Sequence, residues 1–196
     1  MNLIIVAGFL GAGKTTLLLK IASDLVSLKR KRVAIIENEI GQIGIDNQYL
    51  ELEGLKVQQL QSGCICCALS SDLITTLDQL QKSYHPDVVI LEPSGVANAA
   101  KILEVIDRSP LGISERKVIV LVDATRFRAI MAITFPFVQD SLNVADIVVV
   151  NKIDGVDRRA TEEITKEVEC LTGTAKVLKI SATQGTGLKE LMREVC

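Results

Sequence analysis

Apolar residues occur along the chain in short, uninterrupted runs that are rich in valine and isoleucine. Six such runs follow one another: Leu3–Ala7, Val33–Ile36, Val88–Leu91, Val118–Val122, Ile147–Val150 and Val177–Ile180. Runs that are continuous, with no alternation of apolar and polar residues, are typical of strands buried on both faces of a parallel sheet. The pattern therefore predicts six buried, mostly parallel strands.

Segments with the periodicity of helices lie between these runs. They are Thr15–Leu28, Asp72–Lys82, Ala97–Asp107, Arg158–Leu171 and Gly187–Val195. Strands that alternate with helices predict a three-layer α/β fold, with helices on both faces of the sheet. The 196 residues fit one domain. Ligands of such folds bind at the carboxyl ends of the strands, so the residues that follow each run are candidates for chemistry.

One stretch, Asn38–Ala68, has no element assigned by this pattern. About thirty residues make an unusually long connection for a compact domain, and long loops of this kind are often functional. We expect this stretch to be a mobile switch segment within the single domain 1–196.

Composition excludes several kinds of partner. The net charge is −2, and the chain has four Phe, two Tyr and no Trp, which gives little for a nucleic acid to bind. No apolar run approaches the roughly 18–20 residues that cross a bilayer. The N-terminus shows no secretory signal. We expect a cytoplasmic protein without nucleic-acid or membrane partners.

The first strand leads into a phosphate-binding motif. Gly8-Phe9-Leu10-Gly11-Ala12-Gly13-Lys14-Thr15-Thr16 satisfies the pattern GxxxxGK[ST] between a strand and a helix. Glycines allow backbone N–H groups to approach the phosphates, and the start of the helix adds partial positive charge. Lys14 would reach the β and γ phosphates, and the Thr15 hydroxyl would bind Mg²⁺. The predicted nucleotide-binding residues here are Gly8, Gly11, Ala12, Gly13, Lys14, Thr15 and Thr16.

Two later loops predict which base is bound. Asn151-Lys152-Ile153-Asp154 follows the fifth run, and Ser181-Ala182-Thr183 follows the sixth. A carboxylate can accept hydrogen bonds from the N1–H and 2-amino groups of guanine, which adenine lacks, so Asp154 predicts GTP over ATP. Asn151 would brace the loop and Lys152 would lay its stem against the base. The Ala182 N–H would donate to guanine O6, with Ser181 and Thr183 beside it.

The third run ends in Leu91-Glu92-Pro93-Ser94-Gly95. An acid at this place in phosphate-loop proteins holds Mg²⁺ through water, and a nearby glycine contacts the γ-phosphate. Glu92 and Gly95 would take these roles; the alternatives are a solvated loop acid and an ordinary turn glycine. The predicted catalytic groups are Lys14, Thr15 and Glu92. Val96 stands where a catalytic glutamine would follow, and no arginine can be assigned, so we expect turnover on the order of 10⁻³ s⁻¹ or less.

Three of the five cysteines, Cys64, Cys66 and Cys67, lie within Asn38–Ala68. Thiolates bind Zn²⁺, Cu⁺ and similar ions. Two or three of these thiolates with a carboxylate, or two copies of the chain, would complete a transition-metal site. A redox pair and simple burial as small apolar residues are the alternatives.

Together, these residues resemble a known family. GFLGAGKTTLL, Glu37-Asn38-Glu39-Ile40-Gly41, GCICC, EPSG, Val122-Asp123-Ala124 and NKID are similar to the CobW-type members of the metal-insertion GTPases, which include HypB and UreG. The resemblance implies a P-loop GTPase that delivers Zn, Co or Ni to a client metalloprotein or cofactor-assembly protein. It also implies a nucleotide- or metal-dependent homodimer, with metal held by the CxCC thiolates and with Glu37 or Glu39 as further candidate ligands.

The chain departs from the pattern of this family at its C-terminal end. CobW-type chains typically continue into a second domain and a His-rich tract, whereas this sequence ends at Cys196 and contains one histidine, His85. We expect client recognition to be absent or to come from another chain, and His85 to be a loop residue.

Two other kinds of function remain open. One is a regulatory GTPase that gates a metal- or cofactor-dependent partner without carrying metal. The other is a metal-binding module that uses nucleotide only for structure.

Overall fold

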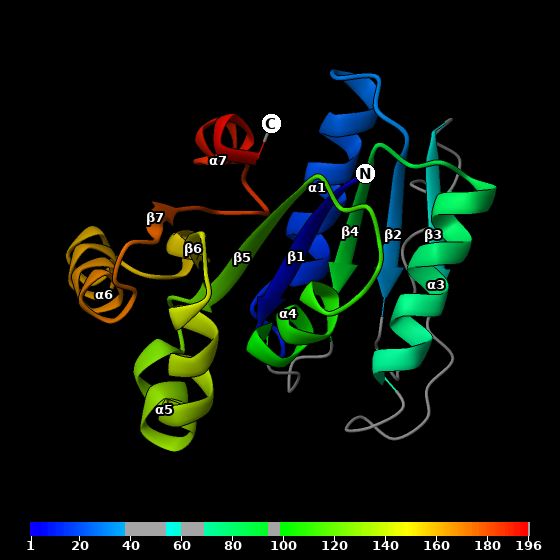
Figure 1. Ribbon diagram of the computed structural model, residues 1–196. Helices are drawn as coiled ribbons and strands as arrows, with labels where there is room; N and C mark the ends of the chain where they lie inside the picture. Colours follow the sequence, from blue (N-terminus) through cyan, green and yellow to red (C-terminus); the bar gives the residue numbers. More distant parts are fainter. Residues whose placement is uncertain (38–53, 60–68, 94–98, 196) are drawn as a thin grey trace.

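The computed structural model describes residues 1–37, 54–59, 69–93 and 99–195. In this part of the chain, seven strands form one sheet in the order β3-β2-β4-β1-β5-β6-β7 (Figure 1). Every pair of neighbouring strands is parallel. The strands are β1 Asn2–Gly8, β2 Val33–Glu37, β3 Leu55–Gln59, β4 Val88–Glu92, β5 Glu115–Asp123, β6 Ile147–Asn151 and β7 Lys176–Lys179.

Helices cover both faces of this sheet. They are α1 Lys14–Ser27, α3 Leu69–Ser83, α4 Ala99–Asp107, α5 Phe127–Asn143, α6 Arg158–Leu171 and α7 Leu188–Val195, with a short 3₁₀ turn, η1, at Ile153–Gly155. Side chains of α1 and α7 pack on one face, and side chains of α3, α4, α5 and α6 pack on the other. This arrangement confirms the predicted three-layer P-loop NTPase fold. None of the described helices is both long and apolar enough to cross a bilayer.

The central strands are buried on both sides, which explains their uninterrupted apolar sequences. In β1, Leu3 and Ile5 face the layer of α3 to α6, while Ile4 and Val6 face α1. All four are at most 4% exposed. Burial of one such side chain contributes about 1.5–3 kcal/mol, so the sheet is a rigid support for the loops at its edges.

Two elements were missed by the sequence pattern. The stretch Asn38–Ala68 was expected to lack regular structure, but strand β3 lies within it at the edge of the sheet. Its Leu55 and Val57 pack on the α1-side core while Lys56 and Gln58 interrupt the apolar run. An edge strand of this kind alternates and gives only a weak signal.

Helix α5 was missed for a different reason. It contains Pro136, and Thr134 has non-helical angles (φ −127°, ψ 24°) where the helix kinks. Proline removes a backbone donor and disrupts the preceding turn, so the segment shows no regular helical period. The remaining predicted helices agree with the structure to within a few residues at each end.

A row of polar residues closes the strands at their carboxyl edge. Glu37 ends β2, Glu92 ends β4, Asp123 ends β5 and Asn151 ends β6. Side chains two residues apart on a strand point to the same face of the sheet. The residue two positions before each of these four, such as Ile35 before Glu37, packs on the α1-side core, so all four side chains belong to that face. In register, Glu37 is beside Glu92, and Asp123 is beside Asn151.

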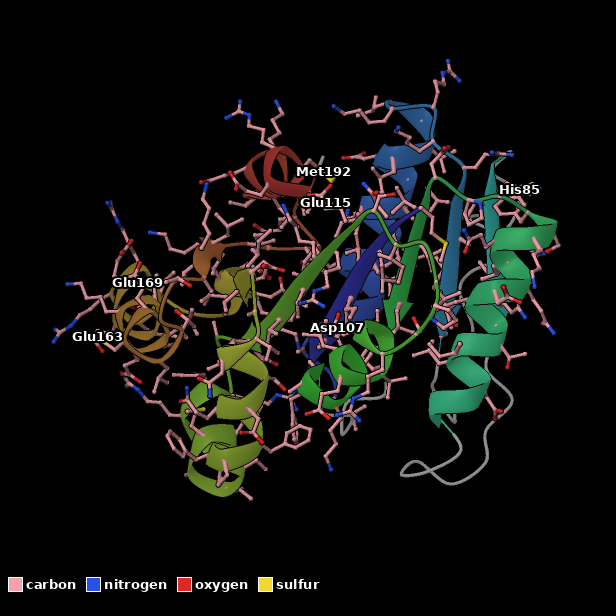
Figure 2. The ribbon with its side chains drawn as sticks, in the orientation of Figure 1. His85, Asp107, Glu115, Glu163, Glu169 and Met192 are labelled. Carbon is pink, nitrogen blue, oxygen red and sulfur yellow. The ribbon has the colours of Figure 1, made fainter. Side chains whose placement is uncertain are left out.

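His85 lies far from this row. It is exposed in the turn before β4, at the amino edge of the sheet, and Figure 2 shows it at the opposite end of the molecule from the α5 helix. It is a loop residue, as the sequence predicted.

Candidate functional site

The loop between β1 and α1 has the backbone geometry of a phosphate-binding loop. Gly8, Gly11 and Gly13 have φ values of 143°, 73° and 95°, which side chains of L-residues rarely allow. A Cβ atom on Gly8 would lie 2.6 Å from the Leu121 carbonyl oxygen, and one on Gly13 would overlap the Asn151 amide. These glycines are therefore required both by the backbone and by close neighbours.

The three predicted catalytic residues lie together at the start of α1. Thr15 Oγ1 donates a hydrogen bond to Glu92 Oε1 at 3.0 Å. Lys14 Nζ lies 3.8 Å from the same oxygen, and Lys14 and Glu92 are 5% and 3% exposed. A hydroxyl and a carboxylate are hard oxygen ligands of the type that Mg²⁺ prefers, so this pair fits the predicted magnesium site. Thr16 follows on the exposed side of α1.

Asn151 connects the phosphate loop to the loop after β7. Its Nδ2 donates to the Ala12 carbonyl oxygen at 2.8 Å, and its Oδ1 accepts from the Ala182 N–H at 3.0 Å. Asn151 is 2% exposed, so these bonds satisfy a buried amide. The geometry fits the predicted bracing role. The Ala182 N–H, which was predicted to donate to guanine O6, donates to Asn151 Oδ1 in this structure.

The rest of the predicted base site is arranged around Asn151. Ser181 is fully buried, and its Oγ accepts from the Gln184 N–H at 3.2 Å, while Thr183 is exposed. Lys152 adopts a left-handed backbone conformation (φ 62°) that turns the chain into η1. Asp154, the predicted reader of guanine, is exposed within η1. Its carboxylate is therefore open to a ligand.

The structure adds Asp123, which the motif analysis did not select as a site residue. Asp123 is 2% exposed and accepts hydrogen bonds from the Thr125 hydroxyl at 2.6 Å and the Thr125 N–H at 3.0 Å. It also binds Lys152 Nζ at 2.9 Å and Arg126 Nε at 3.0 Å. Burial acts to raise the pKa of Asp123, but the hydrogen bonds from Thr125, Lys152 and Arg126 outweigh it and hold the pKa below its ordinary value.

A signal for Asp123 was present in the sequence. It is an acid directly after a buried apolar run, which is the same context that singled out Glu92. The sequence around Arg126, which binds Asp123, gives no such signal. Arg126 contacts the phosphate loop at Leu10, which is 116 residues earlier in the sequence.

Most of the predicted transition-metal residues lie outside the described residues. These are Cys64, Cys66, Cys67 and Glu39, together with Gly95 of the predicted γ-phosphate contact. Glu37 is described; it is 8% exposed and lies beside Glu92 in register. In the described part of the chain, no three His, Cys, Asp or Glu residues are grouped so that they could hold a metal ion.

The chain is similar in sequence to known proteins. Residues 2–179 match the family described as CobW/HypB/UreG, nucleotide-binding domain. The zinc chaperone CobW of a Sinorhizobium species is 29% identical over 92% of this chain and 58% of its own length. The zinc chaperone YjiA of Escherichia coli is 33% identical over 76% of this chain and 48% of its own length. The chain thus spans about half the length of these curated relatives.

Solved structures show the same fold. The hydrogenase maturation factor HypB from Archaeoglobus fulgidus superposes with a TM-score of 0.72 at 17% identity, covering 100% of this chain and 88% of that chain. The zinc-bound YjiA GTPase from E. coli superposes with a TM-score of 0.67 at 25% identity, covering 90% of this chain and 56% of that chain.

Proposed function

Because the chain belongs to the CobW/HypB/UreG family of nucleotide-binding domains, we propose that it binds and hydrolyses GTP and couples this to transition-metal delivery. Zn, Co or Ni would be the cargo, and a client metalloprotein or cofactor-assembly protein would receive it. The proposal includes a cytoplasmic location and a nucleotide- or metal-dependent homodimer.

The convergence of Lys14, Thr15 and Glu92 is the observation that carries the GTPase part. A buried cation, a hydroxyl and a buried carboxylate meet at the mouth of a glycine-rich loop. Lys14 would neutralise charge on the terminal phosphates, and Thr15 and Glu92 would hold Mg²⁺. Mg²⁺, when bound, spreads the charge that develops on the transferred phosphoryl group. The exposed Asp154 would select guanine.

The position of Glu37 supports a link between nucleotide and metal. Glu37 is one strand away from Glu92 at the same edge of the sheet. Strand β3 also ends there, because Gln59 is in register with Glu37, and Cys64 follows Gln59 by five residues in the sequence. The segments that carry the predicted metal ligands thus leave the sheet beside the predicted magnesium site. The relatives named zinc chaperones support the choice of a metal as cargo.

The proposed coupling has a thermodynamic requirement. Nucleotide state can change metal affinity only as far as the GTP and GDP states hold the metal ligands differently. We propose that the segment Asn38–Ala68 responds to the γ-phosphate at one point and binds metal through Cys64, Cys66 and Cys67 at another.

Nucleotide specificity tests the first half of the proposal. Titration with fluorescent GTP and ATP analogues should show a preference for GTP of about 100-fold or more, since adenine leaves the carboxylate without its donors. Asp154→Asn should abolish this preference. The matched control is Asp157→Asn, three residues on, whose carboxylate caps α6 by accepting from the Ala160 N–H at 2.7 Å. Equal binding of GTP and ATP by the unaltered protein would refute the predicted base specificity.

Metal titration tests the second half. Zn²⁺, Co²⁺ and Ni²⁺ are titrated into the reduced protein, loaded with Mg²⁺ and either a non-hydrolysable GTP analogue or GDP. The protein and a control variant of the exposed Cys170, Cys170→Ser, should bind one of these metals with different affinity in the two states. The triple variant Cys64→Ser, Cys66→Ser, Cys67→Ser should lose this binding. Equal metal affinity with both nucleotides would rule out the coupling.

A further inference from the structure

The side chain of Arg126 connects the end of β5 to the phosphate loop. Its Nε donates to Asp123 Oδ2 at 3.0 Å, and its Nη2 donates to the Leu10 carbonyl oxygen at 2.9 Å. Arg126 and Leu10 are 116 residues apart in the sequence. A Cβ atom on Gly11 would lie 2.9 Å from Arg126 Nη2, so the guanidinium is packed against this part of the loop.

The contact with the Leu10 carbonyl controls the direction of a neighbouring donor. The peptide bond is planar and trans, so the Leu10 C=O and the Gly11 N–H point in opposite directions. Arg126 holds the carbonyl on its own side of the loop, and the Gly11 N–H is therefore directed away from Arg126. In a loop of this pattern, inward-facing N–H groups bind the phosphates.

We propose that Arg126 is a positioning residue of the phosphate loop, which orients the Gly11 N–H toward the terminal phosphates of GTP by fixing the Leu10 carbonyl. This inference rests on the proposed GTPase function. It assigns an arginine to the site, where the motifs alone gave none.

Asp123 makes the hold on Leu10 rigid. A guanidinium bound at two of its nitrogens, by Asp123 and by Leu10, has a fixed plane, whereas a side chain bound at one point would rotate. Asp123 also binds Lys152 of the base loop at 2.9 Å. One carboxylate therefore joins the phosphate loop to the base loop, and the two cations around it leave a net positive charge near the phosphates.

Arg128 is a natural control for this role. It lies two residues further along the chain and donates to Glu163 and Glu167 on α6. Glu163 lies on the outer side of α6, away from the phosphate loop (Figure 2). Arg128 lies in the first turn of α5, the helix that Arg126 precedes, and the two side chains are similarly exposed, at 61% and 48%. Removal of Arg128 therefore takes away a comparable arginine without touching the nucleotide site.

The test compares Arg126→Ala, Arg126→Lys and Arg128→Ala in single-turnover hydrolysis of bound GTP. This rate constant does not depend on the fraction of folded protein, so it separates positioning from stability. Arg126→Ala should lower this rate constant on the order of 10- to 100-fold. Without Arg126, the Gly11 N–H is no longer held in the direction in which it would stabilise the charge that develops on the phosphate oxygens. KM should change less than kcat. Arg128→Ala should stay within two-fold of the unaltered protein, roughly the level of a distant surface change.

Arg126→Lys distinguishes orientation from charge. Lysine keeps the positive charge but presents one compact ammonium, which cannot hold Asp123 and Leu10 in the same fixed plane. We expect this variant to remain close to Arg126→Ala in rate. Recovery to the rate of the unaltered protein would show that only the charge matters and would overturn the proposal, as would an Arg126→Ala rate equal to that of Arg128→Ala.

The outcomes separate this inference from the proposed function. If the unaltered protein neither binds nor hydrolyses GTP, the proposed function fails. If it hydrolyses GTP and the Arg126 variants match it, only the role of Arg126 fails. Thermal unfolding without nucleotide, measured for all three variants, checks that each is folded.

Discussion

Glu92 and Asp123 are two buried carboxylates in equivalent places, with different surroundings. They end β4 and β5, the strands on either side of β1, and both belong to the α1-side face. Asp123 binds two cations at 2.9 and 3.0 Å and a hydroxyl at 2.6 Å. Glu92 accepts from the Thr15 hydroxyl at 3.0 Å, and Lys14 Nζ lies 3.8 Å from the same carboxylate oxygen.

This difference shows how one sheet edge supports two roles. The groups around Asp123 come from the loops after β5 and β6, so its charge serves to hold those loops together. Glu92 shares its surroundings with the lysine and threonine of the phosphate loop, which are the groups that a magnesium–triphosphate complex would engage. We therefore expect loss of Glu92 to affect hydrolysis first, and loss of Asp123 to affect stability first.

Glu92→Gln gives the largest expected effect and tests one side of this comparison. Glutamine keeps an oxygen for Thr15 but loses the charge that would hold Mg²⁺, so kcat for GTP should fall on the order of 10²–10³-fold. Binding of GDP without Mg²⁺, measured by calorimetry, should change little. A variant that turns over within three-fold of the unaltered protein would place the essential acid elsewhere.

Asp123→Asn tests the other side. The variant loses the charge that binds Arg126 and Lys152, and both cations then have to be resolvated. Because the Arg126 and Lys152 side chains are 48% and 38% exposed, the expected loss in the free energy of unfolding is about 2–3 kcal/mol, below that of a fully buried pair. Urea denaturation measures it, with Asp154→Asn in the next loop as an exposed control that should change stability by less than about 0.5 kcal/mol. Equal stability of the two variants would contradict the role assigned to Asp123.

The pH dependence of stability sharpens the comparison. In the folded protein, the pKa of Asp123 is held below its ordinary value of 3.8. The contribution of its ionised carboxylate to the free energy of unfolding is therefore fully present above that pH and is lost as the pH falls through the folded pKa. The stability difference between the unaltered protein and Asp123→Asn should be constant near neutral pH and should narrow below about pH 4. Urea denaturation at pH 7, 5, 4 and 3 would detect this. A difference that widens on acidification would mean that folding raises the pKa of Asp123 and does not lower it.

Filling a small pocket beside Asp123 has the smallest expected effect. This pocket of about 30 Å³ lies between β1, β5 and α5, and Phe9, Phe127 and Val138 contribute to its wall. Val138→Ile adds one methylene toward this space and should raise stability by about 0.5–1 kcal/mol without changing hydrolysis. Val177→Ile on β7, which does not line the pocket, is the control. A changed hydrolysis rate in Val138→Ile would show that packing behind Asp123 reaches the phosphate site.

The parts of the site that follow from sequence are those set by local spacing. Lys14 and Thr15 are adjacent in a motif that dictates loop geometry, and Glu92 and Asn151 each follow a buried strand. Because parallel strands end at one edge, their proximity could be predicted without coordinates.

Other features depend on contacts that no local pattern encodes. Arg126 donates to the carbonyl oxygen of a residue 116 positions away. Because this acceptor belongs to the backbone, the residue type at Leu10 does not indicate the contact. The hydrogen bond from the Ala182 N–H to Asn151 Oδ1 was likewise not predicted, because it joins residues 31 positions apart in the sequence. Strand β3 and helix α5 were missed because edge alternation and an internal proline weaken the periodic signal.

The two hydrogen bonds of Asn151 also fix when this site can form during synthesis. They tie Ala12 to Ala182, which is synthesised about 170 residues later. At ribosomal rates of about 5–20 residues per second, about 10–30 s pass between the synthesis of the phosphate loop and the synthesis of Ala182. A nascent chain therefore should not retain nucleotide firmly until translation has passed Ala182.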